Sequence, residues 1–434
     1  MQSSKITFCI NTANNERNHI ELLFRSLYKN LSHSEYPIIV YVENDNQDTV
    51  GFLKTQKELF PNLKIVINPL PVCIGYARNI NLMFEMADTD VVSYLQSDMV
   101  IGPSYDIEVL KYLTEDTIIS ATRIEPPLHP PSSEKITHDF GLDPSKFDLE
   151  AFTRFAESNK KDIQTDFWFA PFTLYKKNWI DIGGHDTLFR RSREDSDLLY
   201  RFSMKGLKIK QVWNALVYHF TCVSSRGPEW WTDKAKERTK LQQVADSIEM
   251  NRFLRKWPGF KHTTTFDETT EYKYQISVNF FNVNSNDSDL LRYYFLFHRI
   301  YIDNPVTRNI IKQIWNQLHT PANNLLNISP TQWEIYKKYY RTWQYEDIYS
   351  DTQIINDDII YNVDLHGISF NNYVNSPIYL QMQRIIHANL DASPGEFEIE
   401  EYPVKIVMNR TINHIQDNLI VKNPSICDIN FTIL

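Results

Sequence analysis

The sequence predicts an α/β fold for its N-terminal half, in which a mixed sheet is flanked by helices. Short apolar, β-branched runs predict buried strands, and segments with apolar residues three and four apart predict helices between them. The predicted strands are Ile6–Ile10, Ile38–Val42, Leu63–Ile67, Val91–Leu95, Phe167–Tyr175 and Ile209–Tyr218; the predicted helices are Asn15–Asn30, Gly75–Met86 and Ser196–Lys205. Strands that alternate with helices are typical of a doubly wound sheet with right-handed crossovers.

Two segments depart from this alternation. Between Arg123 and Asp148 the prolines cluster, which predicts an irregular excursion or lid rather than a continued sheet. After about residue 260 the chain becomes poor in Gly and rich in Asn, Tyr and Ile. Here the patterns predict a polar helix over Lys234–Trp257, helices over Leu290–His298, Val306–Leu318 and Pro330–Trp343, and more β character in Phe397–Ile433. We therefore expect one α/β domain over residues 1–232 and a mixed accessory region, which could bind an acceptor, over 233–434.

Composition indicates a folded chain with more than one core. Its 434 residues exceed the usual size of one domain, and its 42% apolar and 23% charged residues are typical of folded proteins. No apolar run approaches the roughly 18 residues that span a bilayer, so we expect a cytoplasmic protein without a transmembrane segment. The four cysteines, Cys9, Cys73, Cys222 and Cys427, lack metal-ligand spacing, which favours reduced thiols.

The net charge of −9 hides a basic middle segment. Residues 151–259 carry 20 Lys and Arg against 13 Asp and Glu, a net charge of +7. Such a segment is explained equally by a solvated face and by a surface that neutralises phosphate on a donor or a polyanionic acceptor.

Polar residues follow several predicted strands, at the edge where open α/β sheets bind ligands. Thr12 follows the first strand, Glu43 and Asp45 follow the second, and Gly75 opens a helix that also carries Arg78. A carboxylate at a strand end can accept hydrogen bonds from a ribose or base, and an Arg can meet a phosphate. Taken singly, each residue is also explained as a turn or helix-capping residue.

A second set of residues predicts a metal site and a base. Asp98 follows a buried strand after Gln96, where its carboxylate can hold a hard divalent cation. Glu194 and Asp195 precede an amphipathic helix, and His219 ends the strand after it. We expect the side chains at 98, 195 and 219 to converge on one pocket at the rim of the sheet.

In order and spacing, these pieces over residues 5–225 resemble the family 2 glycosyltransferases with a GT-A fold. The resemblance implies that Thr12, Glu43, Asp45, Gly75 and Arg78 line the donor nucleotide, and that Asp98 holds the metal with His219. Asp195 would be the catalytic base, with Glu194 beside it. Gln96 departs from the family's Asp-x-Asp metal motif at its first position, which bears on metal affinity and on the donor sugar.

After His219, the stretch Thr221–Thr232 contains Arg226 and the pair Trp230-Trp231. A loop that closes over the donor would place Arg226 near phosphate and Trp against a sugar face. A surface loop with its indoles packed in the core explains the same residues.

Together these features predict a metal-dependent, inverting glycosyltransferase that uses Mn²⁺ or Mg²⁺ and a nucleotide-diphosphate sugar, with UDP-sugars favoured. The acceptor would be a hydroxyl of a glycan or lipid-linked sugar. Two alternatives remain: transfer to hydroxylated bases of DNA, as in phage genome modification, which the basic segment would help to bind; and a catalytically silent nucleotide-sugar-binding module, which Gln96 favours. A nucleotidyltransferase lacks support because no Gly-rich phosphate loop with a following Lys is present near the N-terminus.

Overall fold

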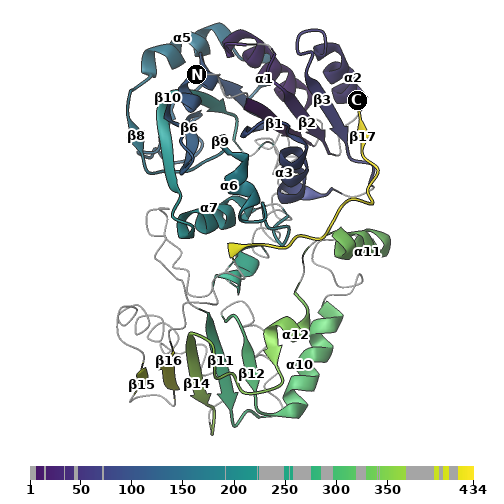
Figure 1. Cartoon of the computed structure of the whole chain (residues 1–434), viewed down its shortest axis with the longest axis vertical. Helices are drawn as coiled ribbons and strands as arrows, with labels where there is room; N and C mark the ends of the chain where they lie inside the picture. Colours follow the sequence, from purple (N-terminus) through teal and green to yellow (C-terminus); the bar gives the residue numbers. More distant parts are fainter. Residues whose placement is uncertain are drawn as a thin grey trace. The chain divides into compact units, whose positions relative to one another are not determined.

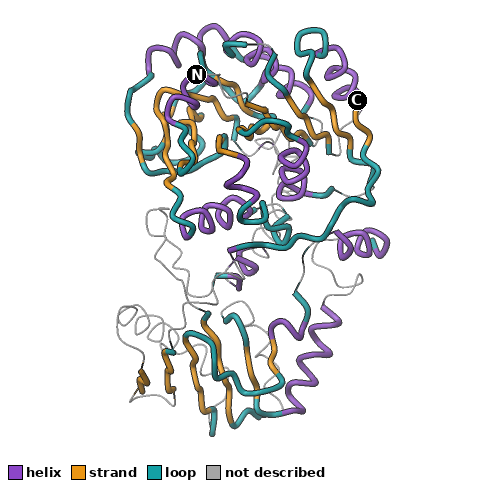
Figure 2. The backbone as a smooth tube through the Cα atoms, viewed as in Figure 1, coloured by secondary structure: helices purple, strands orange, loops and turns teal. Residues whose placement is uncertain are grey.

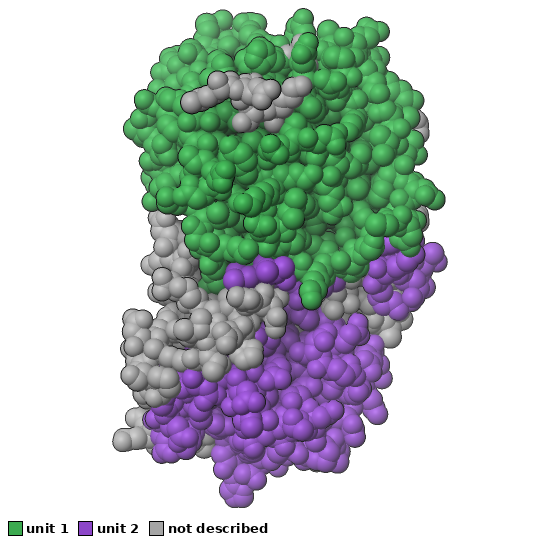
Figure 3. Space-filling view, viewed as in Figure 1, with its two compact units in different colours: residues 1–246, 421–434 green, residues 247–420 purple. Residues whose placement is uncertain are grey.

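The computed structural model describes residues 6–13, 16–33, 35–43, 47–70, 73–190, 192–221, 223, 249–253, 255–257, 275–284, 297–318, 329–339, 341, 343–367, 395–399, 404–409 and 419–434. The chain divides into two compact units, which Figure 3 colours separately. Unit 1 comprises residues 1–246 and 421–434, and unit 2 comprises residues 247–420. The boundary predicted at residue 232 lies outside the described residues.

Unit 1 is built on one mixed sheet whose strands follow the order β17-β3-β2-β1-β4-β9-β6-β10-β5, with β7 beside β6 and β8 beside β10 (Figures 1 and 2). The strands are β1 (Ile6–Thr12), β2 (Ile38–Val42), β3 (Leu63–Ile67), β4 (Val91–Gln96), β5 (Met99–Ile101), β6 (Thr117–Glu125), β7 (Lys135–Thr137), β8 (Gln164–Thr165), β9 (Phe172–Tyr175), β10 (Lys208–His219) and β17 (Thr432–Ile433). The strands β3, β2, β1 and β4 run parallel, whereas β9 is antiparallel to both of its neighbours. The predicted mixed sheet is confirmed.

Helices cover both faces of this sheet. They are α1 (Arg17–Asn30), α2 (Gln47–Gln56), α3 (Gly75–Met86), α4 (Tyr105–Tyr112), α5 (Leu149–Asn159), α6 (Lys176–Ile180) and α7 (Glu194–Met204). Figure 1 shows α1 and α2 on one side of the sheet and α3, α6 and α7 on the other. Because both faces are covered, β1 and β2 are buried at every residue, which explains their continuous apolar runs.

The strand predictions hold closely where the apolar run is unbroken. The strands Ile38–Val42 and Leu63–Ile67 and the helix Gly75–Met86 have the predicted bounds. The predicted strand Phe167–Tyr175 is too long, since only Phe172–Tyr175 is a strand. Before it, the backbone N–H of Phe169 donates to Ser120 Oγ at 2.9 Å, and Pro171 has no N–H for a ladder.

The strand β6 was not predicted, and it overlaps the start of the expected irregular excursion. Its buried residues include Ser120 and Thr122, whose hydroxyls donate to the carbonyls of Phe169 at 2.6 Å and Val212 at 2.9 Å. Hydrogen-bonded polar side chains inside a strand interrupt the apolar pattern from which a buried strand is inferred. Beyond β6 the excursion is irregular, apart from β7, a short 3-10 turn at Pro144–Lys146 and the start of α5.

Unit 2 contains a second mixed sheet of order β13-β12-β11-β14-β16-β15. Its strands are β11 (Ile276–Phe281), β12 (Ile300–Ile302), β13 (Tyr349–Ser350), β14 (Ile359–Asp364), β15 (Gly395–Ile399) and β16 (Val404–Met408), and its described helices include α10 (Pro305–Leu318), α11 (Pro330–Tyr339) and α12 (Tyr345–Ile348). The first four strands are parallel, and β16 is antiparallel to both β14 and β15. The prediction of mixed helix and strand in this part is confirmed.

The C-terminal segment does not stay with unit 2. Residues 421–434 belong to unit 1, where β17 pairs with the outer edge of β3. The prediction of one accessory region over 233–434 did not anticipate this return. The predicted helix Leu290–His298 lies mostly outside the described residues. Among the helices described, none is long and apolar enough to cross a membrane.

Candidate active site

Parallel pairing brings the first strand-end residues to one edge of the sheet. Thr12 pairs with Val42, the residue before Glu43, and Asn11 pairs with Gln96, two residues before Asp98. Thr12 is fully buried, and its Oγ1 has no hydrogen-bond partner within the described part of the chain. A buried hydroxyl without a partner at a strand end is available to a bound ligand.

Glu43 faces the start of α3 from the end of β2. Its Oε1 accepts a hydrogen bond from the backbone N–H of Gly75 at 3.1 Å. Burial raises the pKa of Glu43, and hydrogen bonds from neighbouring side chains and backbone N–H groups oppose that rise. The carboxyl is therefore buried beside a helix N-terminus, where it can bind a polar ligand group in either protonation state.

Gly75 has a positive φ of +74°, and the close approach that it permits is made within the protein. A Cβ at this position would lie 2.4 Å from the carbonyl oxygen of Arg190. That same oxygen accepts a hydrogen bond from Tyr76 N at 3.0 Å. The glycine is thus required for packing of α3 against the Arg190 backbone; contact with a nucleotide stays a prediction.

Arg78 lies one turn into α3 and is 3% exposed. Its Nη1 donates to the carbonyl oxygen of Pro424 at 2.8 Å, which ties α3 to the C-terminal segment. Contact of Arg78 with the donor also stays a prediction.

Asp98 and His219 are neighbours because β5 and β10 pair antiparallel. His219 pairs with Met99, and the N–H of Phe220 donates to the carbonyl oxygen of Asp98 at 3.0 Å. Asp98 Oδ2 and His219 Nε2 are 3.7 Å apart, too far for a direct hydrogen bond. Asp98 Oδ1 has no hydrogen-bond partner among the described residues although the side chain is buried. A carboxylate and an imidazole nitrogen therefore face each other with room for a shared ligand.

Glu125 orients the imidazole of His219. His219 Nδ1 lies 2.8 Å from Glu125 Oε1, and Nε2 faces Asp98. When Nδ1 carries the proton of the neutral ring and donates it to Glu125, Nε2 offers its lone pair toward Asp98. Burial opposes ionisation of Glu125, but His219, Arg123 and Lys135 together hold its pKa well below the usual range. Lys135 Nζ lies 2.9 Å from Glu125 Oε2. A carboxylate behind a histidine is the arrangement that orients a metal-binding imidazole.

Arg123 connects this pair to the start of α7. Burial lowers the pKa of its guanidinium, and the negative charges that oppose the fall are those of Glu125, Asp98 and Asp195. Asp98 and Asp195 therefore lie within electrostatic range of the same largely covered guanidinium. Similarly, burial raises the pKa of Tyr94, with smaller contributions from Tyr76, Glu194 and Asp98. Asp98 therefore lies beside His219 and within electrostatic range of groups that also interact with Glu194 and Asp195. The roles of these four residues stay predictions.

Asp98 and His219 alone are too few ligands for a cation, so other ligands must complete its coordination. Within the described ranges there is no group of three or more His, Cys, Asp or Glu side chains that could hold a metal ion. Mg²⁺ commonly binds one or two protein carboxylates and takes its other ligands from phosphate oxygens and water. Asp98 and His219 fit a cation bound together with a diphosphate.

The N-terminal part of the sequence matches the model of a known protein family. Residues 8–183 match the model of the family described as glycosyl transferase family 2. The chain contains a family 2 glycosyltransferase domain. The matched residues lie in unit 1 and extend from β1 to β9 of its mixed sheet. No curated protein matches the sequence at a significant level.

Solved structures similar to this glycosyltransferase are distant. GalNAc-T7 with UDP, GalNAc and Mn²⁺ is 12% identical, with a TM-score of 0.41, over 57% of this chain and 52% of its own. The mannosyltransferase PcManGT from Pyrobaculum calidifontis, in complex with GDP-Man and Mn²⁺, is 16% identical, with a TM-score of 0.36, over 56% of this chain and 64% of its own. S. aureus TarS 1-349 is 14% identical, with a TM-score of 0.37, over 78% of this chain and 93% of its own. This chain thus spans about half of the GalNAc-T7 structure.

Several residues of the candidate site were not predicted from the sequence, and several predicted residues lie outside the described residues. Arg123, Glu125 and Lys135 were not predicted, because β6 was not recognised. The sequence signal was a carboxylate at the end of an apolar stretch, the same signal that identified Glu43. Asp45 and Arg226, and the pair Trp230-Trp231, lie outside the described residues. Asp195 and His219 lie beyond the matched residues 8–183, so their roles depend on the geometry above.

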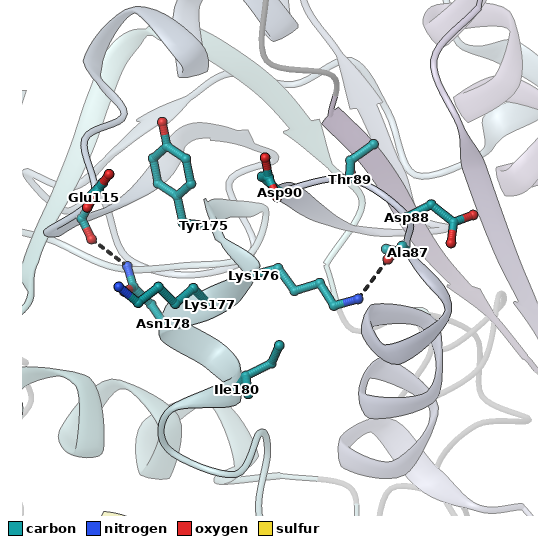
Figure 4. Close-up of a pocket in the computed structure, with 10 residues that line it drawn as sticks. All are labelled: Ala87, Asp88, Thr89, Asp90, Glu115, Tyr175, Lys176, Lys177, Asn178 and Ile180. Atoms are coloured by element: carbon teal, nitrogen blue, oxygen red, sulfur yellow. Dashed lines mark hydrogen bonds between the residues drawn. The ribbon is translucent and has the colours of Figure 1, made fainter.

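A cavity of about 640 Å³ lies at a different part of the glycosyltransferase domain (Figure 4). It is lined by residues that precede β4 and β6 or follow β9, among them Asp90, Glu115 and Lys176. Lys176 Nζ donates to the carbonyl oxygen of Ala87 at 2.7 Å. Because Asp98 follows the opposite end of β4, this cavity is separate from the candidate active site.

Proposed function

We propose that this glycosyltransferase transfers a sugar from a UDP-sugar to an acceptor hydroxyl with inversion at the anomeric carbon. The observation that supports it most is that Asp98 and His219 face each other at 3.7 Å, with Arg123 within electrostatic range of both Asp98 and Asp195. This arrangement offers ligands for a diphosphate-bound cation on one side and a carboxylate base on the other.

The donor would occupy the edge formed by β1, β2 and the start of α3. Thr12 Oγ1 and the buried Glu43 are suited to ribose or base groups, because both lie at strand ends beside a helix N-terminus. We place Gly75, Arg78, Asp45 and Arg226 in the same donor site, as the family resemblance implies.

Asp98 and His219 would hold Mn²⁺ or Mg²⁺ at the diphosphate. When bound, the cation supplies charge stabilisation to the departing diphosphate. Glu125 keeps the His219 ring in the tautomer that has its lone pair on Nε2, and Asp98 supplies a buried carboxylate oxygen. Gln96, at the first position of the metal motif, contributes an amide where the family has a carboxylate, so we expect weaker metal affinity.

Asp195 would act as the base at the first turn of α7. It removes the proton of the acceptor hydroxyl while that oxygen forms a bond to the anomeric carbon. The bond between this carbon and the diphosphate oxygen breaks, and its electron pair leaves with the nucleotide. Glu194, the first residue of the same turn, lies beside the base.

The acceptor in this proposal is a hydroxyl of a glycan or a lipid-linked sugar. The basic segment 151–259 leaves hydroxylated DNA as the competing acceptor. Salt-sensitive binding to duplex DNA would favour the second acceptor, because phosphate contacts release counterions. Salt-independent weak binding would favour the first.

The test is hydrolysis of a panel of UDP- and GDP-sugars with and without Mn²⁺, for the wild type and Asp195→Asn. We expect one donor to turn over only with the metal, and the variant to lose about 10²- to 10⁴-fold in rate with donor binding nearly intact. The exposed Asp181, changed to Asn, is the matched control. Full turnover by Asp195→Asn would show that another group is the base, and a wild type inactive on every donor would overturn the proposed function.

A further inference from the structure

The C-terminal segment 421–434 contacts the turn Gly183–Thr187, which precedes α7, the helix that carries the proposed base. Figure 1 shows this segment in yellow, passing α3 on its way to β17. Val421 N donates to the carbonyl oxygen of Ile182 at 3.1 Å. Gly183 has a φ of +74°, and a Cβ there would lie 2.0 Å from the carbonyl oxygen of Val421. The first glycine of the Gly-Gly-His-Asp turn is therefore required by contact with the C-terminal segment.

Asn423 binds this turn with every polar group of its carboxamide. Its Nδ2 donates to the carbonyl oxygens of Gly183 at 3.0 Å and His185 at 2.9 Å, and its Oδ1 accepts from Thr187 N at 2.9 Å. A carboxamide has two N–H donors and one acceptor oxygen. Asn423 thus matches three backbone groups of one turn, although it lies more than two hundred residues later in the chain.

Arg201 of α7 joins the helix to the residue before the turn, and it also forms a buried ion pair within the helix. Arg201 Nη1 donates to the carbonyl oxygen of Ile182 at 2.9 Å, and Arg201 Nε donates to Asp197 Oδ2 at 2.8 Å. Both side chains of this pair are fully buried. Since Asp197 lies in the first turn of α7 with Glu194 and Asp195, the turn at Ile182 and the start of α7 are held together.

The same segment also anchors α3 on the donor side. Pro424, next to Asn423, accepts the hydrogen bond of Arg78 through its carbonyl oxygen. The start of α3 in turn donates from Tyr76 N to the carbonyl oxygen of Arg190, between the turn and α7. Two consecutive residues, 423 and 424, therefore bond the turn that precedes α7 and the helix α3 beside the proposed donor site.

We propose that Asn423 is a positioning residue for sugar transfer: by fixing the Gly183–Thr187 turn it sets the first turn of α7, and hence Asp195, relative to Asp98 and His219. This inference rests on the proposed function, because it takes Asp195 as the base. A displacement of about 1 Å at a reacting group can cost about 10²-fold in rate. An anchor that touches neither substrate nor metal is thus expected to control turnover.

The experiment compares the full-length wild type with Asn423→Ala, Asn423→Asp and the control Asn430→Ala, which changes an exposed Asn of the same segment. Asn423→Asp keeps an acceptor for Thr187 N but turns a carboxylate oxygen toward two carbonyl oxygens. Two quantities are measured: kcat and KM for Mn²⁺-dependent hydrolysis of UDP-sugars, and hydrogen–deuterium exchange of peptides from residues 182–204 and from β1 and β4.

We expect Asn423→Ala and Asn423→Asp to lower kcat about 10- to 100-fold, with donor KM changed less than about twofold. Exchange should be faster in residues 182–204 and unchanged in β1 and β4, and Asn430→Ala should match the wild type in both measurements. A purely structural role of Asn423 would instead speed exchange throughout unit 1.

Three outcomes overturn the proposal: unchanged exchange in residues 182–204, wild-type kcat despite faster exchange there, or faster exchange that extends to β1 and β4. Failure of the proposed function is recognised separately. A wild type without hydrolysis of any UDP-sugar would overturn the function, while exchange would still show whether Asn423 orders the turn. Loss of turnover in Asn423→Ala but not in Asp195→Asn would overturn the positioning of the base.

Discussion

Glu125 is the residue whose role depends most on its immediate partners. Its carboxylate lies beside the imidazole of His219 and the cationic groups of Arg123 and Lys135. These three neighbours favour the ionised form of Glu125, although burial opposes it. The bond to His219 Nδ1 fixes which nitrogen faces Asp98. A single carboxylate that was not recognised from the sequence therefore orients the imidazole for which we propose a role in metal binding.

At this scale we predict that Glu125→Gln weakens Mn²⁺ binding about 10- to 100-fold, because a neutral amide replaces the charged acceptor that orients and polarises the imidazole. Isothermal titration of Mn²⁺ in the presence of UDP measures the effect. The exposed Glu157, changed to Gln, is the control, and it should bind Mn²⁺ as the wild type does. Equal affinity of Glu125→Gln and the wild type would show that the Glu125 carboxylate does not support metal binding through His219.

Among the elements, α7 is the helix that would carry the proposed base. Its first turn carries Glu194, Asp195 and Asp197, an acidic set that the positive end of the helix dipole favours. Farther along, Arg201 reaches back to Asp197 and to the carbonyl oxygen of Ile182. The helix that would present the proposed base is thus bonded to Ile182 by Arg201, which also forms a buried salt bridge within the helix.

We predict that Asp197→Ala lowers the free energy of unfolding by about 3–5 kcal/mol, because it leaves Arg201 buried without its carboxylate. The double variant Asp197→Leu/Arg201→Met removes both charges and should recover most of this loss. Chemical denaturation of the three proteins gives the comparison. A double variant as unstable as Asp197→Ala would show that packing, and not the unpaired charge, causes the loss.

The predicted elements were most accurate where the conformation depends on residues that are neighbours along the chain. Runs such as Ile38–Val42 are apolar because both faces of the strand are covered, so the pattern reads directly from the sequence. The strand β6 was not predicted because the polar residues Ser120 and Thr122 are buried in it. Their hydrogen-bond partners lie 49 and 90 residues away in the chain. A pattern of neighbours along the chain cannot contain such partners.

At the scale of the whole molecule, buried histidines of unit 1 connect stability to pH. Burial lowers the pKa of His19 to about 4 and that of His185 to about 3, from an unperturbed value of 6.5. Between the folded and unfolded pKa values the unfolded chain binds more protons than the folded one. Stability contributed by the neutral rings is therefore complete above pH 6.5 and is lost as the pH falls toward 4.

We predict that the free energy of unfolding falls between pH 7 and pH 4.5, and that His19→Leu falls less. Over this pH range the share of His19 is on the order of 2–3 kcal/mol, since one pKa unit corresponds to about 1.4 kcal/mol. Denaturant unfolding at several pH values measures both slopes, and other groups common to both proteins cancel in the comparison. Identical slopes for the wild type and His19→Leu would show that His19 does not contribute.

By itself the sequence determined the alternation of strands and helices, the family 2 glycosyltransferase domain, and the residues at strand ends from which the site was predicted. These depend on apolar periodicity and on residue types at fixed positions, which are properties of neighbours along the chain. Only the tertiary structure decided that Glu125 orients His219, that Arg123 lies within range of both Asp98 and Asp195, and that residues 421–434 return to hold the turn before α7. These depend on hydrogen bonds and charges between residues far apart in the chain, and the fold alone brings such residues together.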